Sequence, residues 1–157
     1  MAESDLLEQI PLMRYGSVVL HIGDAPELEA FLAERIYEFN AKATGYFDGE
    51  CFSATEREDS GAIRGGITGY TWGRSCYVTN LWVDGAARGK GLGGQLLRAA
   101  EDHARRRGCT LILVDTHTFQ APGFYERMGY QQQAVIQDHP VGHANVIFAR
   151  RLTPEEG

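Results

Sequence analysis

The sequence has few of the features that would place it outside ordinary globular proteins. Only five of its 157 residues are proline and three are cysteine. It contains no run of about 18 apolar residues that could form a membrane-spanning helix. Residues 1–16 carry acids where a secretory signal would carry bases, and they lack its apolar centre. We therefore expect a cytoplasmic protein with no membrane partner.

The few cysteines and histidines exclude the common metal patterns. Cys51, Cys76 and Cys109 are an odd number, lie far apart and form no C-x-x-C pair. They are predicted to be buried free thiols in a reducing compartment. His139 and His143 are four residues apart, but they lack an H-E-x-x-H context and a nearby cysteine. No metal site is expected.

Basic residues are also in deficit. The chain has 15 Lys and Arg against 21 Asp and Glu, for a formal net charge of −6. A nucleic-acid surface needs clustered Lys and Arg, so no nucleic-acid partner is expected. The acidic balance favours a cationic substrate through long-range attraction. The length predicts one domain over residues 1–157, with a core over about residues 17–152 that buries about two thirds of the unfolded surface.

The first half of the chain predicts a strand, a helix and three further strands. Residues 17–22 are apolar and β-branched, which indicates a strand. A helix is expected from an N-cap at Asp24 to about Gly45, because apolar residues recur there at helical spacing. The three later strands are joined by turns too short for crossovers, so they should be antiparallel neighbours. They are predicted over residues 51–57, 62–72 and 76–83.

The second half predicts helices between strands. One helix begins near Leu92 and ends in three arginines followed by Gly108. Its predicted inner face consists of Leu92, Leu96, Ala100, His103 and Ala104. The apolar residues 110–114 indicate a buried strand parallel to the one before the helix. The remaining predicted elements are a short helix over 122–128, paired strands over 130–136 and 145–150, and a frayed tail after Leu152.

The turn between the strand that ends at Val83 and the helix that begins at Leu92 is the most informative segment. Its glycines, between residues 89 and 94, alternate with Arg88 and Lys90 before the helix begins. A helix start leaves backbone N–H groups unpaired, and the helix dipole makes them a site for phosphate. Glycines lack the Cβ atoms that would hold a pyrophosphate away. The turn therefore predicts a pyrophosphate-containing ligand.

Three other interpretations of this turn fit less well. Gly89, Gly91 and Gly94 match a dinucleotide-binding fingerprint, with Asp115 as the ribose-binding acid. However, further residues separate them from the strand, and the upstream strands are antiparallel. A P-loop would need a hydroxyl residue after Lys90, where a glycine stands. A turn without a ligand would lose stability to its glycines with no compensation.

A second motif follows the predicted buried strand. Residues 122–130, PGFYERMGY, place an aromatic pair in a short helix shortly before a Gly-Tyr pair. Together with Arg88-x-x-Gly91-x-Gly93, in this order and spacing, the motif resembles the GNAT superfamily of N-acetyltransferases. Residues 116–125 and 138–143 are similar to a small bacterial subgroup of that superfamily. The motif positions are Phe124, Tyr125, Gly129 and Tyr130.

The resemblance implies an acyl-CoA N-acyltransferase fold, which is an α/β fold with a mixed sheet, antiparallel N-terminal strands and a splayed parallel central pair. Residues 81–83 would splay from residues 111–114, so that the pantetheine arm of acetyl-CoA acts as a substitute strand. Backbone N–H groups of residues 88–93 would hold the pyrophosphate. The implied cofactor-binding residues are Leu81, Trp82, Val83, Arg88, Gly89, Lys90, Gly91, Leu92, Gly93, Gly94 and Thr118.

The resemblance also implies the catalytic groups. Tyr125 would face the departing sulfur, and a backbone N–H near Val83 would meet the oxyanion. Several family members carry a carboxylate or a histidine on the fourth strand as general base, and the nearest position here is Tyr77. The base stays unassigned, and a water chain is an alternative to any side chain. The candidate side chains are Asp115, His117 and Glu50.

The implied activity is an N-acetyltransferase that moves an acetyl group from acetyl-CoA to a primary amine of a small molecule. Direct attack on the thioester is favoured, because no cysteine falls at the cofactor turn to carry the acyl group. A protein lysine as acceptor, a regulatory acyl-CoA-binding module without turnover and a homodimer stay open. Asn40, Tyr46 and Phe47 are predicted to line the acceptor pocket.

Overall fold

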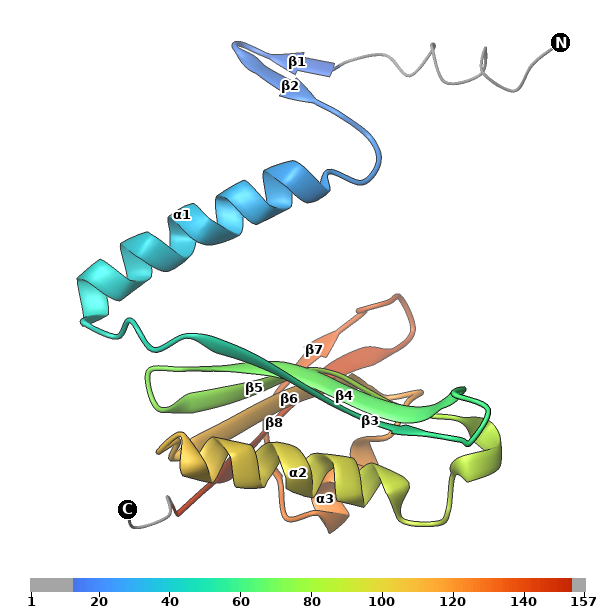
Figure 1. Ribbon diagram of the computed structural model, residues 1–157. Coiled ribbons are helices and arrows are strands. Elements are labelled where there is room, and N and C mark those ends of the chain that lie inside the picture. The colour runs from blue at the N-terminus through green and yellow to red at the C-terminus, as the bar shows by residue number, and fades with distance from the viewer. Residues whose placement is uncertain (1–12, 154–157) are drawn as a thin grey trace, which may run out of the picture. The chain divides into compact units, whose positions relative to one another are not determined.

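The first part of the chain contains a short β-hairpin followed by a long helix (Figure 1). The structure is a computed structural model that describes residues 13–153, and it divides into two units after Thr44. The first unit contains β1 (Met13–Tyr15), β2 (Val18–Leu20) and α1 (Pro26–Thr44). The predicted helix is confirmed. The strand predicted over residues 17–22 is shorter, and it pairs with β1, which the sequence did not predict. The prediction of one domain stays a prediction.

The second unit is built on a mixed sheet. Across it the strands run in the order β3-β4-β5-β6-β8-β7. Only β5 and β6 are parallel, and the other neighbours are antiparallel. This confirms the predicted mixed sheet and its antiparallel first three strands. The bounds are β3 (Glu50–Arg57), β4 (Ile63–Trp72), β5 (Ser75–Val83), β6 (Leu111–His117), β7 (Gln131–Gln137) and β8 (Ala144–Arg151).

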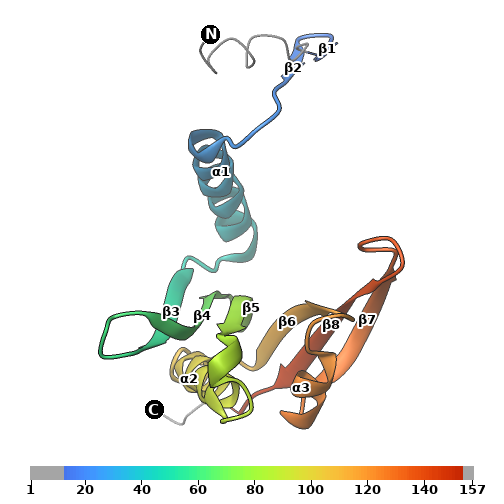
Figure 2. The same ribbon diagram turned by 90° about the vertical axis from the view of Figure 1, so that its right-hand side faces the viewer.

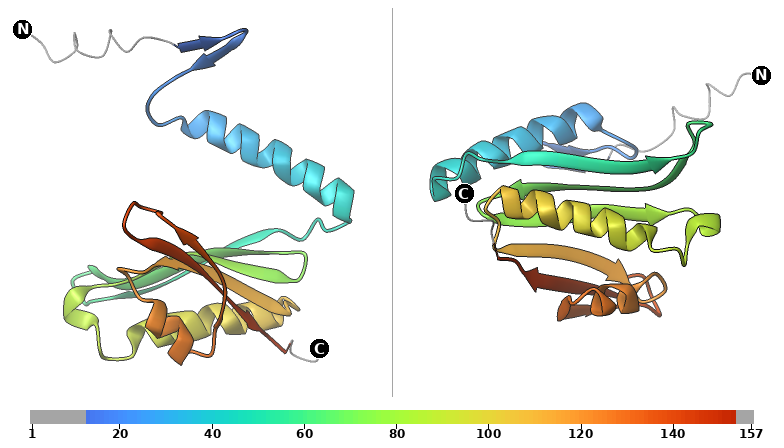
Figure 3. Two further views of the ribbon diagram at one scale, coloured as in Figure 1. Left: turned by 180° about the vertical axis from the view of Figure 1, so that it is seen from behind. Right: turned by 60° about the horizontal axis from the view of Figure 1, so that its bottom comes forward.

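Both helices of this unit, α2 (Leu92–Arg106) and α3 (Pro122–Arg127), cover the same face of the sheet (Figures 1 and 3). The predicted inner face of α2 is buried apart from His103, which is partly exposed and contacts the ring of Phe52. Cys51 was predicted to be buried, but it is exposed, because it alternates onto the face of β3 away from α2. Cys76 and Cys109 are buried free thiols as predicted.

A buried carboxylate that the sequence did not reveal joins α2 to its surroundings. Glu101 accepts hydrogen bonds from the hydroxyl of Tyr130 at 3.0 Å and from Nη1 of Arg150 at 2.9 Å. Its side chain is only 3% exposed, so these partners offset the free energy of removing its charge from water. The contacts tie α2 to β8 and to the end of α3.

The central parallel pair separates partway along its length. β5 and β6 pair only from Ser75 with Leu111 to Val78 with Val114. The next residue, Thr79, is a bulge in the pairing of β5 with β4, and a bulge bends its strand. Beyond it, the two strands diverge (Figure 2). The predicted splay is therefore present, but residues 81–83 separate from residues 115–117, because residues 111–114 are paired.

Some sequence predictions fall on chain ends that the structure does not describe. The segment compared with a secretory signal lies largely in residues 1–12, and the predicted frayed tail lies largely in residues 154–157. Within residues 13–153, no helix is both long and apolar enough to cross a membrane.

Candidate active site

A cavity of about 940 Å³ lies where β5 and β6 separate. Adjacent residues on a strand point to opposite faces of a sheet. The cavity is nevertheless lined by adjacent residues of β6, including Val114 and Asp115. Val114 belongs to the core under α2, so Asp115 faces the other side. The cavity therefore passes through the sheet, with one mouth on the α2 and α3 face and one on the opposite face.

Backbone groups of β5 face this opening. The N–H of Asp84 donates to the carbonyl of Arg64, at the end of the pairing with β4, at 2.8 Å. Because backbone groups alternate in direction along a strand, the N–H groups of Leu81 and Val83 point away from β4, into the opening. Nε of Arg88 donates to the carbonyl oxygen of Val83 at 3.0 Å, which agrees with this direction. These N–H groups suit an extended ligand chain and an oxyanion.

The glycine turn presents bare amides at the start of α2. Gly91 caps the helix with a φ of 84° and no side-chain hydrogen bond, and the first main-chain bond joins the N–H of Gln95 to Gly91. The N–H groups of residues 89–94 donate no hydrogen bond within residues 13–153. A Cβ at Gly89 or Gly91 would meet no atom within 4 Å. The residues present therefore fit a pyrophosphate.

The amide of Arg88 was predicted to belong to this cradle, but it does not. It donates to the carbonyl of Asp84 at 3.1 Å. The reason is the short 3-10 helix η2 (Gly85–Ala87), which Asp84 caps and which uses that N–H. The cradle begins one residue later than the sequence predicted.

Two arginines near the turn were missed by sequence reasoning. Arg127 of α3 lines the cavity, and the guanidinium of Arg98 lies over Gly94, 3.3 Å from the position of a Cβ there. Neither forms an ion pair in the described part of the chain. Arg127 lies within the second motif, residues 122–130, and that motif could have identified it as a candidate site residue. The positive charge of the two arginines favours a nearby anion.

Two predicted cofactor-binding residues, Lys90 and Thr118, use their side chains in hydrogen bonds with the main chain of the protein. Nζ of Lys90 donates to the carbonyl of Ala86 at 3.2 Å, which braces the turn. Oγ1 of Thr118 accepts from the N–H of Ala144 at 3.1 Å, which fixes the start of β8. Neither residue lines the cavity, whereas the other predicted cofactor-binding residues do.

Tyr125 lies on α3 with its ring packed against Phe124, Tyr130 and Phe148. It lines the cavity and is 5% exposed. Burial, and then the negative charge of Asp115, raise the pKa of Tyr125 to about 12. Its hydroxyl forms no hydrogen bond with the residues that the structure describes. Tyr125 is therefore a protonated phenol with a hydrogen bond to offer.

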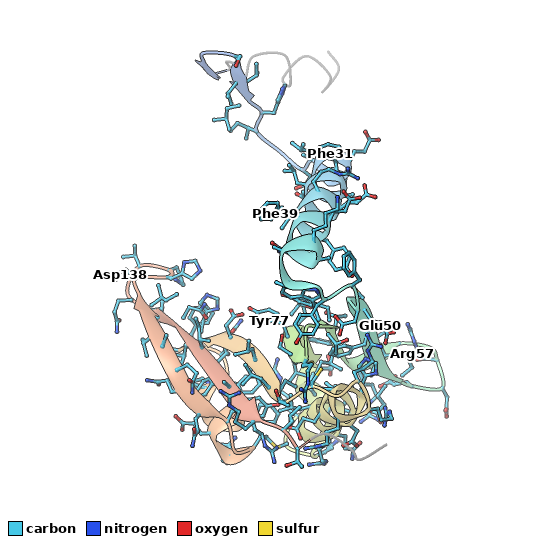
Figure 4. The ribbon with its side chains drawn as sticks, turned by 90° about the vertical axis from the view of Figure 1, so that its left-hand side faces the viewer. Phe31, Phe39, Glu50, Arg57, Tyr77 and Asp138 are labelled. Carbon is cyan, nitrogen blue, oxygen red and sulfur yellow. The ribbon has the colours of Figure 1, made fainter. Side chains whose placement is uncertain are left out.

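The carboxylate of Asp115, in the cavity wall, is paired with a phenol. The hydroxyl of Tyr77 donates a short hydrogen bond to Oδ1 of Asp115. That bond, and then burial, raise the pKa of Tyr77 to about 12. Cys76 and Val78 belong to the core under α2, so Tyr77 between them faces the other side of the sheet (Figure 4). The two residues are 38 positions apart in the sequence, so no local pattern could predict that they form a pair.

The other candidate bases lie in different surroundings. His117 lines the cavity and stacks on His139 at 5.5 Å between ring centroids. The β7–β8 loop, with Asp138 at its tip in Figure 4, is thus beside the cavity. Glu50 instead lies 3.5 Å from Nε2 of His103 on α2, and it does not line the cavity.

Of the predicted acceptor-pocket residues, Tyr46 and Phe47 do not line this cavity, and the prediction for Asn40 stays a prediction. The main-chain oxygen of Tyr46 accepts from Nε1 of Trp72 at 3.0 Å. Phe47 is exposed, and Asn40 belongs to the first unit. Among residues 13–153, no group of three or more His, Cys, Asp or Glu side chains has the arrangement of a metal site.

Comparison with known proteins gives one family. The model of the acetyltransferase (GNAT) family matches residues 18–130. The chain is 42% identical to blasticidin-S acetyltransferase of Streptomyces morookaense over 95 residues, which cover 60% of this chain and 70% of that protein. It is 34% identical to acetyltransferase Atu2258 of Agrobacterium fabrum over 113 residues, which cover 72% of this chain and 82% of that protein.

Solved structures agree with the sequence comparisons. A crystal structure of an acetyltransferase from Bacillus cereus superposes with a TM-score of 0.71 at 34% sequence identity. The superposition covers 85% of this chain and 98% of the other. The strand order, the diverging central pair and the glycine turn described above therefore lie in a chain arrangement found in known acetyltransferases.

Proposed function

Because the chain belongs to the acetyltransferase (GNAT) family and is an N-acetyltransferase, we propose that it transfers the acetyl group of acetyl-CoA directly to a primary amine of a small molecule. The observation that carries this proposal is the cavity through the sheet. One mouth offers bare amides and guanidinium groups, and the other offers the carboxylate of Asp115, which accepts a hydrogen bond from the phenol of Tyr77. A phosphate-bearing donor and an amine acceptor can enter from opposite sides and meet inside.

The donor fits the mouth at the start of α2. Its diphosphate would lie on the N–H groups of residues 89–94, where the helix dipole and the missing Cβ atoms favour phosphate. Arg88 and Arg127 line the same mouth and supply positive charge. The pantetheine chain would pair with the N–H groups of Leu81 and Val83 in the manner of an added strand.

The reaction needs a neutral amine. An alkylammonium with a pKa of about 10.4 is neutral in about one part in a thousand near pH 7. Its deprotonation therefore contributes about 4 kcal/mol to the barrier. The nitrogen then attacks the thioester carbonyl carbon, so that a C–N bond forms and the C–S bond breaks. The sulfur leaves as a thiolate and takes up a proton, and the acetylated amine is released.

Two groups of this chain would stabilise the charges that develop. The N–H of Leu81 or Val83 would donate to the carbonyl oxygen as it becomes an oxyanion. Tyr125 would donate a hydrogen bond to the departing thiolate. With a pKa of about 12, against about 8.5 for a thiol, full proton transfer from this phenol would be uphill by about 5 kcal/mol. Hydrogen bonding is therefore its contribution.

The small-molecule acceptor is supported by the relative named for blasticidin S, which shares 42% of its aligned residues with this chain. The proposal is tested by incubating the protein with acetyl-CoA and a panel of amines while free thiol is measured. We expect thiol release that depends on the amine. Binding of coenzyme A without thiol release for any amine would instead indicate a regulatory acyl-CoA-binding module.

The identity of the donor has a separate test. Coenzyme A should raise the melting temperature of the protein, because a ligand that binds only the folded state stabilises it. NAD at the same concentration should leave the melting temperature unchanged. Protection by NAD but not by coenzyme A would support dinucleotide binding and would contradict the proposal.

A further inference from the structure

Asp115 is a half-buried carboxylate with no counter-ion among the described residues of its own unit. Its Oδ1 accepts the hydrogen bond from Tyr77, and its other oxygen accepts none from residues 45–153. No Lys, Arg or His nitrogen among residues 45–153 lies within ion-pair distance of it. A partly desolvated charge without a counter-ion is costly. Its position in the cavity wall suits a ligand that brings the missing cation.

The surroundings of Asp115 also suit a cation. The ring of Tyr77, whose hydroxyl holds the carboxylate, lies 5.7 Å from the ring of Tyr70. Both residues alternate onto the face of the sheet away from α2. Aromatic faces attract cations through their quadrupole. The guanidinium groups of the cavity, Arg88 and Arg127, come from the turn and from α3, at the donor mouth.

The charge of Asp115 bears differently on a reacting amine and on a second cationic group. A nearby carboxylate favours the charged form of an amine, whereas the reacting nitrogen must be neutral to attack. A group that stays protonated during the reaction therefore suits Asp115 as a partner.

We propose that Asp115, held by Tyr77 and flanked by Tyr70, binds a second cationic group of the acceptor, so that the preferred substrates are diamines or other amines with an additional fixed positive charge. This inference rests on the proposed acetyl transfer and deepens it, since it names the class of acceptor. Asp115 selects the substrate by its distal charge, and the reacting amine loses its proton to water or to another group.

The test compares two acceptors of equal length, 1,4-diaminobutane and 4-amino-1-butanol, in which a hydroxyl replaces the second ammonium. The natural chain should show a kcat/KM at least tenfold higher for the diamine. Asp115→Asn should reduce this preference to within twofold, chiefly through KM. Asp102→Asn is the matched control, because it removes an equal charge from an exposed position on α2, and it should keep the preference.

Calorimetry separates this inference from the proposed function. We expect 1,4-diaminobutane to bind the protein saturated with coenzyme A, and Asp115→Asn to weaken that binding at least tenfold while coenzyme A still binds. Equal affinity of the two proteins for the diamine would overturn the inference, whether or not acetyl transfer occurs. Equal loss of kcat for both acceptors, with KM unchanged, would also overturn it and would make Asp115 part of the proton path.

Discussion

The two mouths of the cavity differ in charge and in the groups that form them. The donor mouth consists of main-chain amides at the start of α2, with Arg88 and Arg127 beside them. The proposed acceptor mouth presents Asp115, which lines the cavity and accepts a hydrogen bond from Tyr77 of the neighbouring strand. Under the proposed function, the polyanion would be bound mainly by backbone amides, which require glycines in a local pattern. Recognition of a single cation requires a particular side chain, which any part of the chain can supply.

The largest expected effect tests whether the donor mouth depends on bare backbone. Gly91→Ala should weaken coenzyme A binding about 100-fold, because a Cβ would displace the phosphate from one or two charge-assisted hydrogen bonds. Isothermal titration calorimetry measures this change. The control is Gly61→Ala, since Gly61 has a similar φ of 87° and also has nothing within 4 Å of its Cβ position.

The two glycine variants should lose similar melting temperature, because each places an alanine in the left-handed region at a cost of about 1 kcal/mol. Only Gly91→Ala should lose affinity for coenzyme A. Unchanged affinity in that variant would show that the phosphates do not lie on this turn.

The second-largest expected effect concerns Tyr125, which lines the cavity between its two mouths. Tyr125→Phe should lower kcat at least tenfold with little change in affinity for acetyl-CoA, because the phenol acts only as the thiolate forms. Steady-state kinetics with direct titration of the donor measures both quantities. Tyr130→Phe removes a hydroxyl that bonds Glu101 instead, so it should lower thermal stability and leave kcat within threefold.

The raised pKa of Tyr125 predicts how turnover depends on pH in alkaline solution. Because the pKa is raised to about 12, the phenol keeps its proton at every lower pH. Turnover should therefore rise as the amine is deprotonated and should not fall up to about pH 10. Equal turnover by the wild-type protein and by Tyr125→Phe would show that the Tyr125 hydroxyl takes no part in the reaction.

A smaller effect tests the positive charge at the donor mouth. Arg127→Ala should weaken coenzyme A binding about fivefold at low salt, and the difference should shrink as salt is added, because exposed charges are screened. Arg106→Ala changes the net charge equally at the exposed end of α2 and should leave binding within twofold. Equal effects of the two substitutions would point to long-range attraction alone.

The smallest expected effect concerns a carboxylate outside both mouths. Glu50→Gln should change kcat and KM less than twofold, because Glu50 lies beside His103 and Arg107, outside the cavity wall. Kinetics at several pH values measures this. A loss of tenfold or more, with a shifted pH profile, would make Glu50 the general base and would contradict this account of the acceptor mouth.

Several parts of the molecule were predictable because their signals are local. The helix that ends before Gly45, the amphipathic α2 and the glycine turn each depend on residues close together in sequence. The order of β3, β4 and β5 followed from turn lengths, since short connections force antiparallel neighbours. The second motif correctly predicted that Tyr125 lies on a short helix.

Other parts depended on pairing between distant residues. The bulge at Thr79 has no distinctive residue of its own, yet it coincides with the end of β5–β6 pairing. The use of the Arg88 amide within the turn depends on how Asp84 caps η2. The buried Glu101 resembled an ordinary polar residue of a helix until Tyr130 and Arg150 were placed around it.

By itself, the sequence determined most of the elements, the antiparallel order of β3, β4 and β5, and the glycine turn before α2, because hydrophobic periodicity and backbone freedom act over a few residues. Only the tertiary structure decided where β5 and β6 separate, that the resulting cavity runs through the sheet, and that Tyr77 forms a hydrogen bond with Asp115 of the cavity wall. The physical reason is register: the pairing of two strands far apart in the chain sets which side chains share a face, and no local pattern encodes that pairing.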